Sequence, residues 1–161
     1  MKIFTKFLFV LIMFFAFTQR SYSQLIIDGS INNVSYTGAA QDFTVPMDLN
    51  LVGLTFELEG GDGGFARIRN TVPLFEKTCK SNGGEGATTE ITFDVGSGAG
   101  MIPHGSMLRF VVGGQGVSGN ENIVTGTSFQ YGGGGGGSAV LYKAPSSSTW
   151  NLLAVAGGGG G

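Results

Sequence analysis

Short runs of alternating apolar and polar residues recur along the chain, and each run predicts a β-strand. In Leu54–Glu59, Leu54, Phe56 and Leu58 share one face and polar residues share the other; Glu90–Val95 repeats this pattern. Glycine and other turn residues separate the runs, and no window of a dozen residues has helical periodicity. We therefore expect an all-β fold, an antiparallel β-sandwich, with further strands at Phe43–Val45, Phe65–Arg69, Met107–Val112, Ala139–Lys143 and Trp150–Ala156.

Two polyglycine runs each adjoin an apolar strand. Extended threefold polyglycine makes no internal hydrogen bonds, so its N–H and C=O groups need neighbouring chains. A flexible linker is the alternative interpretation, but linkers mix glycine with serine and lack large apolar neighbours. We expect packed polyglycine helices whose structural glycines are Gly132, Gly133, Gly134, Gly135, Gly136, Gly137, Gly157, Gly158, Gly159, Gly160 and Gly161.

The first 23 residues have the pattern of an export signal. Lys2 and Lys6 precede the apolar stretch Phe7–Phe17, which is shorter than the about 20 residues that span a bilayer. Small residues follow at Ser21 and Ser23, so we predict a mature chain that begins at Gln24 and is secreted or displayed at the cell surface. A buried core helix is the alternative. No second long apolar segment follows, so we expect no membrane span after signal removal.

Removal of the signal changes the charge balance. Six Lys and Arg remain against eleven Asp and Glu, a net charge of about −5. The remaining basic residues lie scattered along the sequence, which argues against a nucleic-acid surface. The lone cysteine, Cys79, cannot form an internal disulfide; a partly exposed structural thiol and an intermolecular link both stay open.

The mature length suits one domain. We divide it into an N-terminal segment, residues 24–42, and a glycine-rich β domain, residues 43–161. Because five glycines without a following strand form no obvious last element, we expect this domain to continue beyond Gly161.

Motifs that would carry catalysis are weak. Gly114–Gly119 matches the dinucleotide fingerprint by letters, but no helical pattern follows to hold a pyrophosphate. The only histidine, His104, has the sequence context of a turn, and Asp62 that of a turn aspartate bonded to its own backbone or, less favourably, a weak cation ligand. We therefore predict no catalytic, cofactor-binding or metal-binding residues, and no enzymatic activity.

Aromatic residues are the best candidates for partner contacts, because aromatic side chains dominate interface energies. The candidates are Tyr131, Tyr142 and Trp150, together with the loop Ser118–Thr127. A core position is the alternative for each, and it is favoured more for Tyr142, which lies on a predicted strand.

The second half of the chain resembles a known family. Its order is the strand Leu108–Gly116, Tyr131 with polyglycine, the strand Ser138–Val140, then Leu152–Gly161. This order resembles the extracellular glycine-rich region of the anaplastic lymphoma kinase and leukocyte tyrosine kinase receptors. The resemblance implies polyglycine helices beside a sandwich similar to tumour necrosis factor, in an ectodomain that recognises protein ligands. Similar modules occur in bacterial exported proteins and phage tail adhesins.

The chain also departs from those receptors. It has one cysteine where they have several disulfides, and it carries no kinase motifs. We therefore expect an exported glycine-rich binding or adhesion module whose partner is an extracellular protein or a surface glycan. One alternative is the ligand-binding ectodomain of a receptor tyrosine kinase-like protein. Another is a structural wall or matrix protein that assembles through its glycines.

Overall fold

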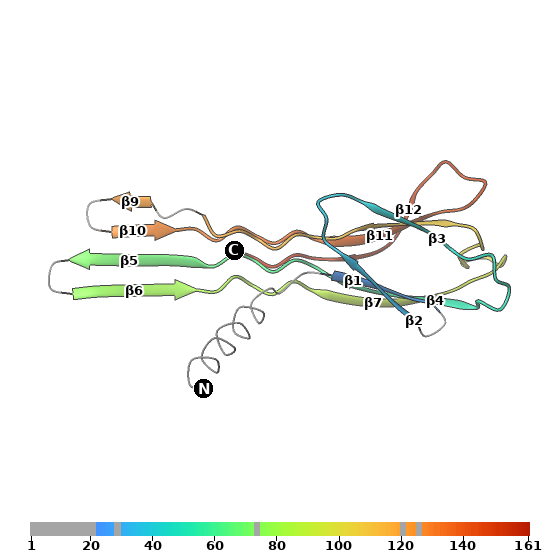
Figure 1. Ribbon diagram of the computed structural model, residues 1–161, viewed down its shortest axis with the longest axis horizontal. Coiled ribbons are helices and arrows are strands. Elements are labelled where there is room, and N and C mark those ends of the chain that lie inside the picture. The colour runs from blue at the N-terminus through green and yellow to red at the C-terminus, as the bar shows by residue number, and fades with distance from the viewer. Residues whose placement is uncertain (1–21, 28–29, 73–74, 120–121, 125–126) are drawn as a thin grey trace, which may run out of the picture.

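A computed structural model describes residues 22–161 apart from 28–29, 73–74, 120–121 and 125–126. The described residues form antiparallel sheets and no helix, which confirms the predicted all-β class (Figure 1). The predicted signal falls almost wholly outside them. The strands are β1 (Tyr22–Ile27), β2 (Ser30–Ser35), β3 (Gln41–Thr44), β4 (Gly53–Glu59), β5 (Ala66–Val72), β6 (Phe75–Ser81), β7 (Thr88–Asp94), β8 (Met107–Val111), β9 (Asn122–Val124), β10 (Thr127–Gln130), β11 (Ser138–Lys143) and β12 (Asn151–Ala156).

Two four-stranded sheets enclose the hydrophobic core. Sheet A has the order β2-β1-β4-β7, and sheet B has the order β12-β11-β8-β3. Alternation along β4 buries every second residue, and the ring of Phe56 reaches the ring of Phe110 on β8 at 6.0 Å between centroids. Because burial of one such side chain contributes about 1.5–3 kcal/mol, this shared core stabilises both sheets. Its largest fully buried apolar residues are Leu25, Val34, Val45, Leu54, Phe56, Leu58, Ile102, Leu108, Phe110 and Val140.

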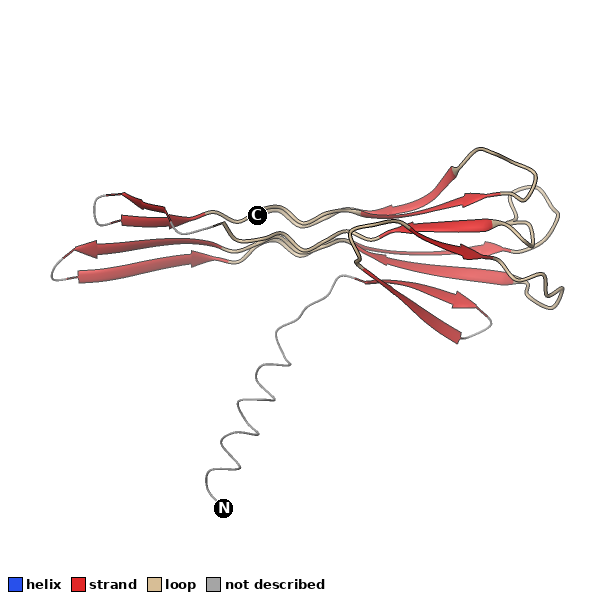
Figure 2. Cartoon of the chain, turned by 45° about the horizontal axis from the view of Figure 1, so that its top comes forward, coloured by secondary structure: helices blue, strands red, loops and turns tan. Residues whose placement is uncertain are grey.

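Five glycine-rich segments leave one end of this sandwich side by side, and we call them the glycine bundle. They are residues 60–65, 82–87, 113–118, 131–137 and 157–161, drawn as parallel loops between the sheets in Figure 2. Backbone hydrogen bonds of 2.6–3.0 Å join each segment to its neighbours. The bundle is therefore ordered by contacts between segments, and a flexible-linker interpretation does not fit these bonds.

Hydrogen-bond partners in the bundle change with a three-residue cycle. Along segment 60–65, Gly60 and Gly63 donate to segment 82–87, whereas Gly61 and Gly64 donate to segment 131–137. The carbonyl oxygen of Asp62 accepts a hydrogen bond from segment 113–118. The carbonyl oxygen of Gly61 accepts a hydrogen bond from Gly159, so segment 60–65 bonds to all four other segments, which a flat sheet does not allow.

Close approach of backbones explains why glycine fills these segments. A Cβ atom at Gly135 would overlap the carbonyl oxygen of Gly61, and a Cβ atom at Gly63 would overlap that of Gly160. Backbone atoms cannot move aside as a flexible side chain can. By contrast, a Cβ atom at Gly157 or Gly160 would meet nothing within 4 Å.

Beyond the bundle lies a third sheet, sheet C, in the order β6-β5-β10-β9. Its two hairpins are excursions from the sandwich. The chain leaves β4, forms β5 and β6, and returns to β7; it then leaves β8, forms β9 and β10, and returns to β11. Each excursion crosses the bundle twice, so the bundle carries sheet C away from the core (Figure 1).

Strands at all seven predicted places are present, with ends shifted by at most three residues. Strands β1, β2, β6, β9 and β10 were not predicted. The sequence of β6, FEKTCKS, has no apolar alternation, because sheet C has no second layer to bury one face. Residues 24–42, set apart in the sequence analysis, supply most of β1, all of β2 and the start of β3, which pair with β4 and β8.

Candidate functional site

Sheet C is the part of the molecule best placed to meet a partner. Among its residues of described burial, only Ser128 is buried. Ile68 is 50% exposed, and its cross-strand neighbour Cys79 is exposed and free. Both faces of this sheet are therefore accessible surface, and an exposed thiol at Cys79 leaves the intermolecular link open.

One face of sheet C is basic. Arg67 lies directly opposite Lys80, and Arg69 lies two residues along the same face of β5. The neighbouring strand β10 adds the polar residues Ser128 and Gln130, which pair with Arg69 and Arg67. The basic residues are scattered along the sequence, but the fold gathers three of them on one face. Hairpin pairing brings together cations that lie 11 to 13 positions apart in the sequence.

A groove of about 700 Å³ is formed by the glycine bundle. Its walls come from segments 62–65, 82–85 and 115–118, and they include the exposed apolar side chains of Phe65 and Val117. Asp62 and Glu85 supply carboxylates to the same walls. The groove thus offers apolar surface and hydrogen-bond acceptors within the bundle.

Asp62 has a different role from the one predicted. Its Oδ1 atom accepts a hydrogen bond of 2.8 Å from the backbone N–H of Gly86, on another segment. The predicted bond to its own backbone is wrong, because Asp62 lies in an extended bundle segment and not in a turn. The Asp62 side chain thus links segments 60–65 and 82–87, which a glycine at this position could not do.

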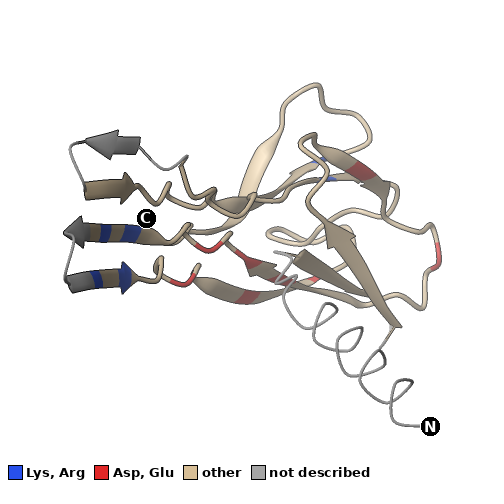
Figure 3. Cartoon of the chain, turned by 60° about the vertical axis from the view of Figure 1, so that its left-hand side comes forward, with Lys and Arg blue, Asp and Glu red and all other residues tan. Residues whose placement is uncertain are grey.

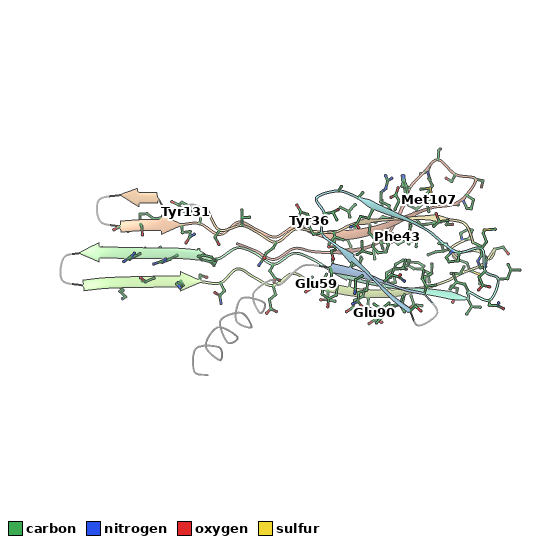
Figure 4. The ribbon with its side chains drawn as sticks, viewed as in Figure 1. Tyr36, Phe43, Glu59, Glu90, Met107 and Tyr131 are labelled. Atoms are coloured by element: carbon green, nitrogen blue, oxygen red, sulfur yellow. The ribbon has the colours of Figure 1, made fainter. Side chains whose placement is uncertain are left out.

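The three aromatic candidates do not form one site. Tyr131 is 65% exposed at the end of β10, beside sheet C, as labelled in Figure 4. Its carbonyl accepts a hydrogen bond from Gly119, so Tyr131 and the loop Ser118–Thr127, which contains β9, do lie together. Tyr142 is half-buried and packs against the core, as the alternative interpretation expects.

Trp150 belongs to a charged cluster at the far end of β11 from the glycine run. Its ring lies 4.3 Å from the guanidinium carbon of Arg109 and 5.0 Å from Nζ of Lys143. Arg109 also donates two hydrogen bonds of 2.7 Å to Asp42. These bonds lower the pKa of Asp42 below its ordinary value of 3.8 and raise the pKa of Arg109. Trp150 is thus held within its own sheet, on the sandwich.

An acidic surface lies on the outer face of sheet A. Glu57 pairs directly with Glu90, and Glu59 lies two residues along β4 (Figure 4). Burial, followed by the nearby charges of Asp62 and Glu57, raises the pKa of Glu59 above its ordinary value of 4.5. Like charges directly opposite each other destabilise a strand pair, so this face is a candidate for a cationic partner.

The remaining motifs have structural positions. His104 lies in a turn, with Nδ1 3.2 Å from the carbonyl oxygen of Pro46. Of the fingerprint-like residues Gly114–Gly119, all but Gly119 lie in the glycine bundle. Within the part of the chain that the structure describes, no three His, Cys, Asp or Glu side chains gather as a metal site, and no membrane-spanning helix occurs.

Sequence reasoning missed Tyr36 and the basic face. The ring of Tyr36 lies against Gly114, where a Cβ atom would come within 2.8 Å of it. No pattern signals this contact, because Tyr36 follows the unpredicted strand β2.

Comparison of the chain with protein-family models, with curated proteins and with solved structures gives no match.

Proposed function

We propose that the chain is an exported binding or adhesion module, without catalysis of its own, in which the glycine bundle holds sheet C at a fixed distance from the sandwich. The hydrogen bonds between bundle segments carry this proposal. A flexible tether would let sheet C move freely, whereas a bonded bundle presents it in one orientation. The export step rests on the signal-like residues 1–23.

The bundle segments are polyglycine helices in this proposal. A threefold helix repeats its direction every three residues, which fits the three-residue cycle of partners along segment 60–65. Close packing at Gly63 and Gly135 fits it too. The resemblance to the glycine-rich receptor ectodomains supports the same conformation and a protein or glycan partner outside the cell.

The test has an export arm and a binding arm. The full chain is expressed in a secreting host, and the secreted product is sequenced from its N-terminus. We expect Gln24 as the first residue, which leaves Gln24–Ile27 of β1 to pair with β4. The purified product is then labelled and its saturable binding to cells of the source organism is measured.

Two glycine variants make the binding arm specific. Gly135→Ala should reduce binding, because its Cβ atom overlaps the backbone of Gly61 and loosens the bundle; Gly160→Ala should leave binding unchanged. Amide exchange in β4 confirms that the sandwich stays folded in both. A product retained inside the cell contradicts export, and no saturable binding contradicts the adhesion role.

The receptor alternative has its own test. If this chain is the ligand-binding part of a receptor tyrosine kinase-like protein, its full reading frame contains a transmembrane segment followed by kinase motifs. A reading frame without them contradicts that alternative and leaves the adhesion module and the structural wall or matrix protein.

A further inference from the structure

Charge is distributed unevenly over the molecule. Four of the six Lys and Arg residues that follow position 23 lie on β5 and β6, together with one acidic residue, Glu76. The strands of sheet A contain no Lys, Arg or His, and they carry four carboxylates. Figure 3 shows the basic bands at the end of the molecule formed by sheet C, and acidic bands on the bundle and the sandwich.

The basic face of sheet C consists of Arg67, Arg69 and Lys80. Strand register places all three on one side, with Arg67 directly opposite Lys80. Two like charges in that position repel each other. Lys77, on the same hairpin, pairs with Asn70 and so points to the other face.

The acidic face of sheet A is the counterpart of this arrangement. Burial alternates along β4, so Glu57 and Glu59 point outward, and Glu90 and Asp94 share the exposed side of β7. Glu57 and Glu90 form a like-charged pair directly across the strands. Sheet C and sheet A therefore each hold a like-charged pair, and nearby groups of the opposite charge would offset the repulsion within each pair.

We propose that the basic face of sheet C docks on the acidic face of sheet A in a second copy of this chain. Charge complementarity argues for this occupant, since one chain carries both surfaces. Within one copy the glycine bundle lies between the two faces, so they cannot meet there (Figure 1). Docking between copies places carboxylates beside both cations of the repulsive pair. This inference does not depend on export or on an outside partner.

The size of the faces predicts a weak, salt-sensitive contact. A seven-residue strand rises about 23 Å, and three to four strands span about 10–15 Å, so each face offers about 200–350 Å². The total is below the about 1,200 Å² of a standard stable interface. Association should therefore appear at high protein concentration and low salt, and disappear near 1 M salt, where the Debye length is about 3 Å.

Charge-swap variants test the proposal by sedimentation velocity of the purified protein. Arg67→Glu/Lys80→Glu and Glu57→Lys/Glu90→Lys each reverse the sign of the directly opposed pair on one face and keep that pair like-charged, so repulsion within the fold is unchanged in kind. Each variant alone should associate at least about tenfold more weakly than the wild type. An equimolar mixture of the two should associate again, because every basic face then meets an acidic one.

A matched control separates position from net charge. Lys80→Glu should weaken association, whereas Lys77→Glu, the same change on the other face of the same strand, should not. A wild type that stays monomeric at low salt overturns the proposal, as does a mixture that fails to associate. If wild type binds dextran sulfate but not itself, the basic face is a site for polyanions and the proposal is wrong. Cell binding is measured separately, so its failure does not bear on this result.

Discussion

The sandwich and sheet C are built from the same antiparallel pairing, yet they are stabilised differently. In the sandwich, β4 alternates buried and half-buried residues, and its buried side packs on sheet B. Sheet C is a single layer in which Ile68 is half exposed and only Ser128 is buried among residues of described burial. An isolated sheet with no buried face is marginal in water, so sheet C depends on its attachment to the bundle.

This difference shows how glycine extends a fold. Apolar burial in the core stabilises the sandwich. The glycine bundle is instead held by backbone hydrogen bonds between its segments, and it supports sheet C away from that core. Bundle segments directly adjoin three strands of sheet C, namely β5, β6 and β10. The bundle therefore sets the strand register there, as apolar alternation does in the sandwich. A sheet without a core can then display a polar, charged surface on both faces.

The largest effect should come from the core. Phe56→Ala should destabilise the protein by about 3–5 kcal/mol, because the cavity would lie between Phe93 and Phe110. Ile68→Ala, an apolar truncation on sheet C, should cost less than about 1 kcal/mol. Urea unfolding followed by circular dichroism measures both. Equal costs would mean that sheet C has a core of its own and would break the comparison.

The bundle should show the next largest effect. Gly63→Ala should cost about 1–3 kcal/mol, because its Cβ atom would overlap the carbonyl of Gly160. Gly157→Ala, with open space around the added Cβ atom, should be neutral or stabilise by about 0.4–1 kcal/mol. Thermal unfolding ranks the two variants. Amide exchange should rise in β5 and β6 before β4 for Gly63→Ala, and a uniform rise would argue against the bundle as the support of sheet C.

A smaller, pH-dependent effect should come from Glu59. Its raised pKa means that the folded protein holds this proton more tightly than the unfolded chain. The corresponding stability is fully present below the ordinary pKa of 4.5 and is lost as pH rises through the folded pKa. Glu59→Gln should therefore be more stable than wild type at neutral pH and equal to it in acid. Denaturation across this pH range checks the sign, and a variant that is less stable at neutral pH would contradict it.

The smallest effect should come from the Asp42–Arg109 pair on the sandwich surface. Because the pKa of Asp42 is lowered, its contribution to stability is present above the ordinary value of 3.8 and is lost as pH falls through the folded pKa. In Arg109→Met, the carboxyl of Asp42 should titrate closer to its ordinary value. Carboxyl NMR titration measures this shift. An unchanged titration would mean that Arg109 does not set the pKa of Asp42.

By itself, the sequence determined the all-β class and the strands of the sandwich, because Leu54, Phe56 and Leu58 reveal a buried face through their spacing. It also pointed to ordered glycine runs, since Gly132–Gly137 and Gly157–Gly161 adjoin strands. Only the tertiary structure decided sheet C and its basic face. Strand β6 has no apolar period to read, and Arg67 meets Lys80 only through hairpin register. Single-layer surfaces leave little trace in a sequence, because no burial constrains which residues occupy them.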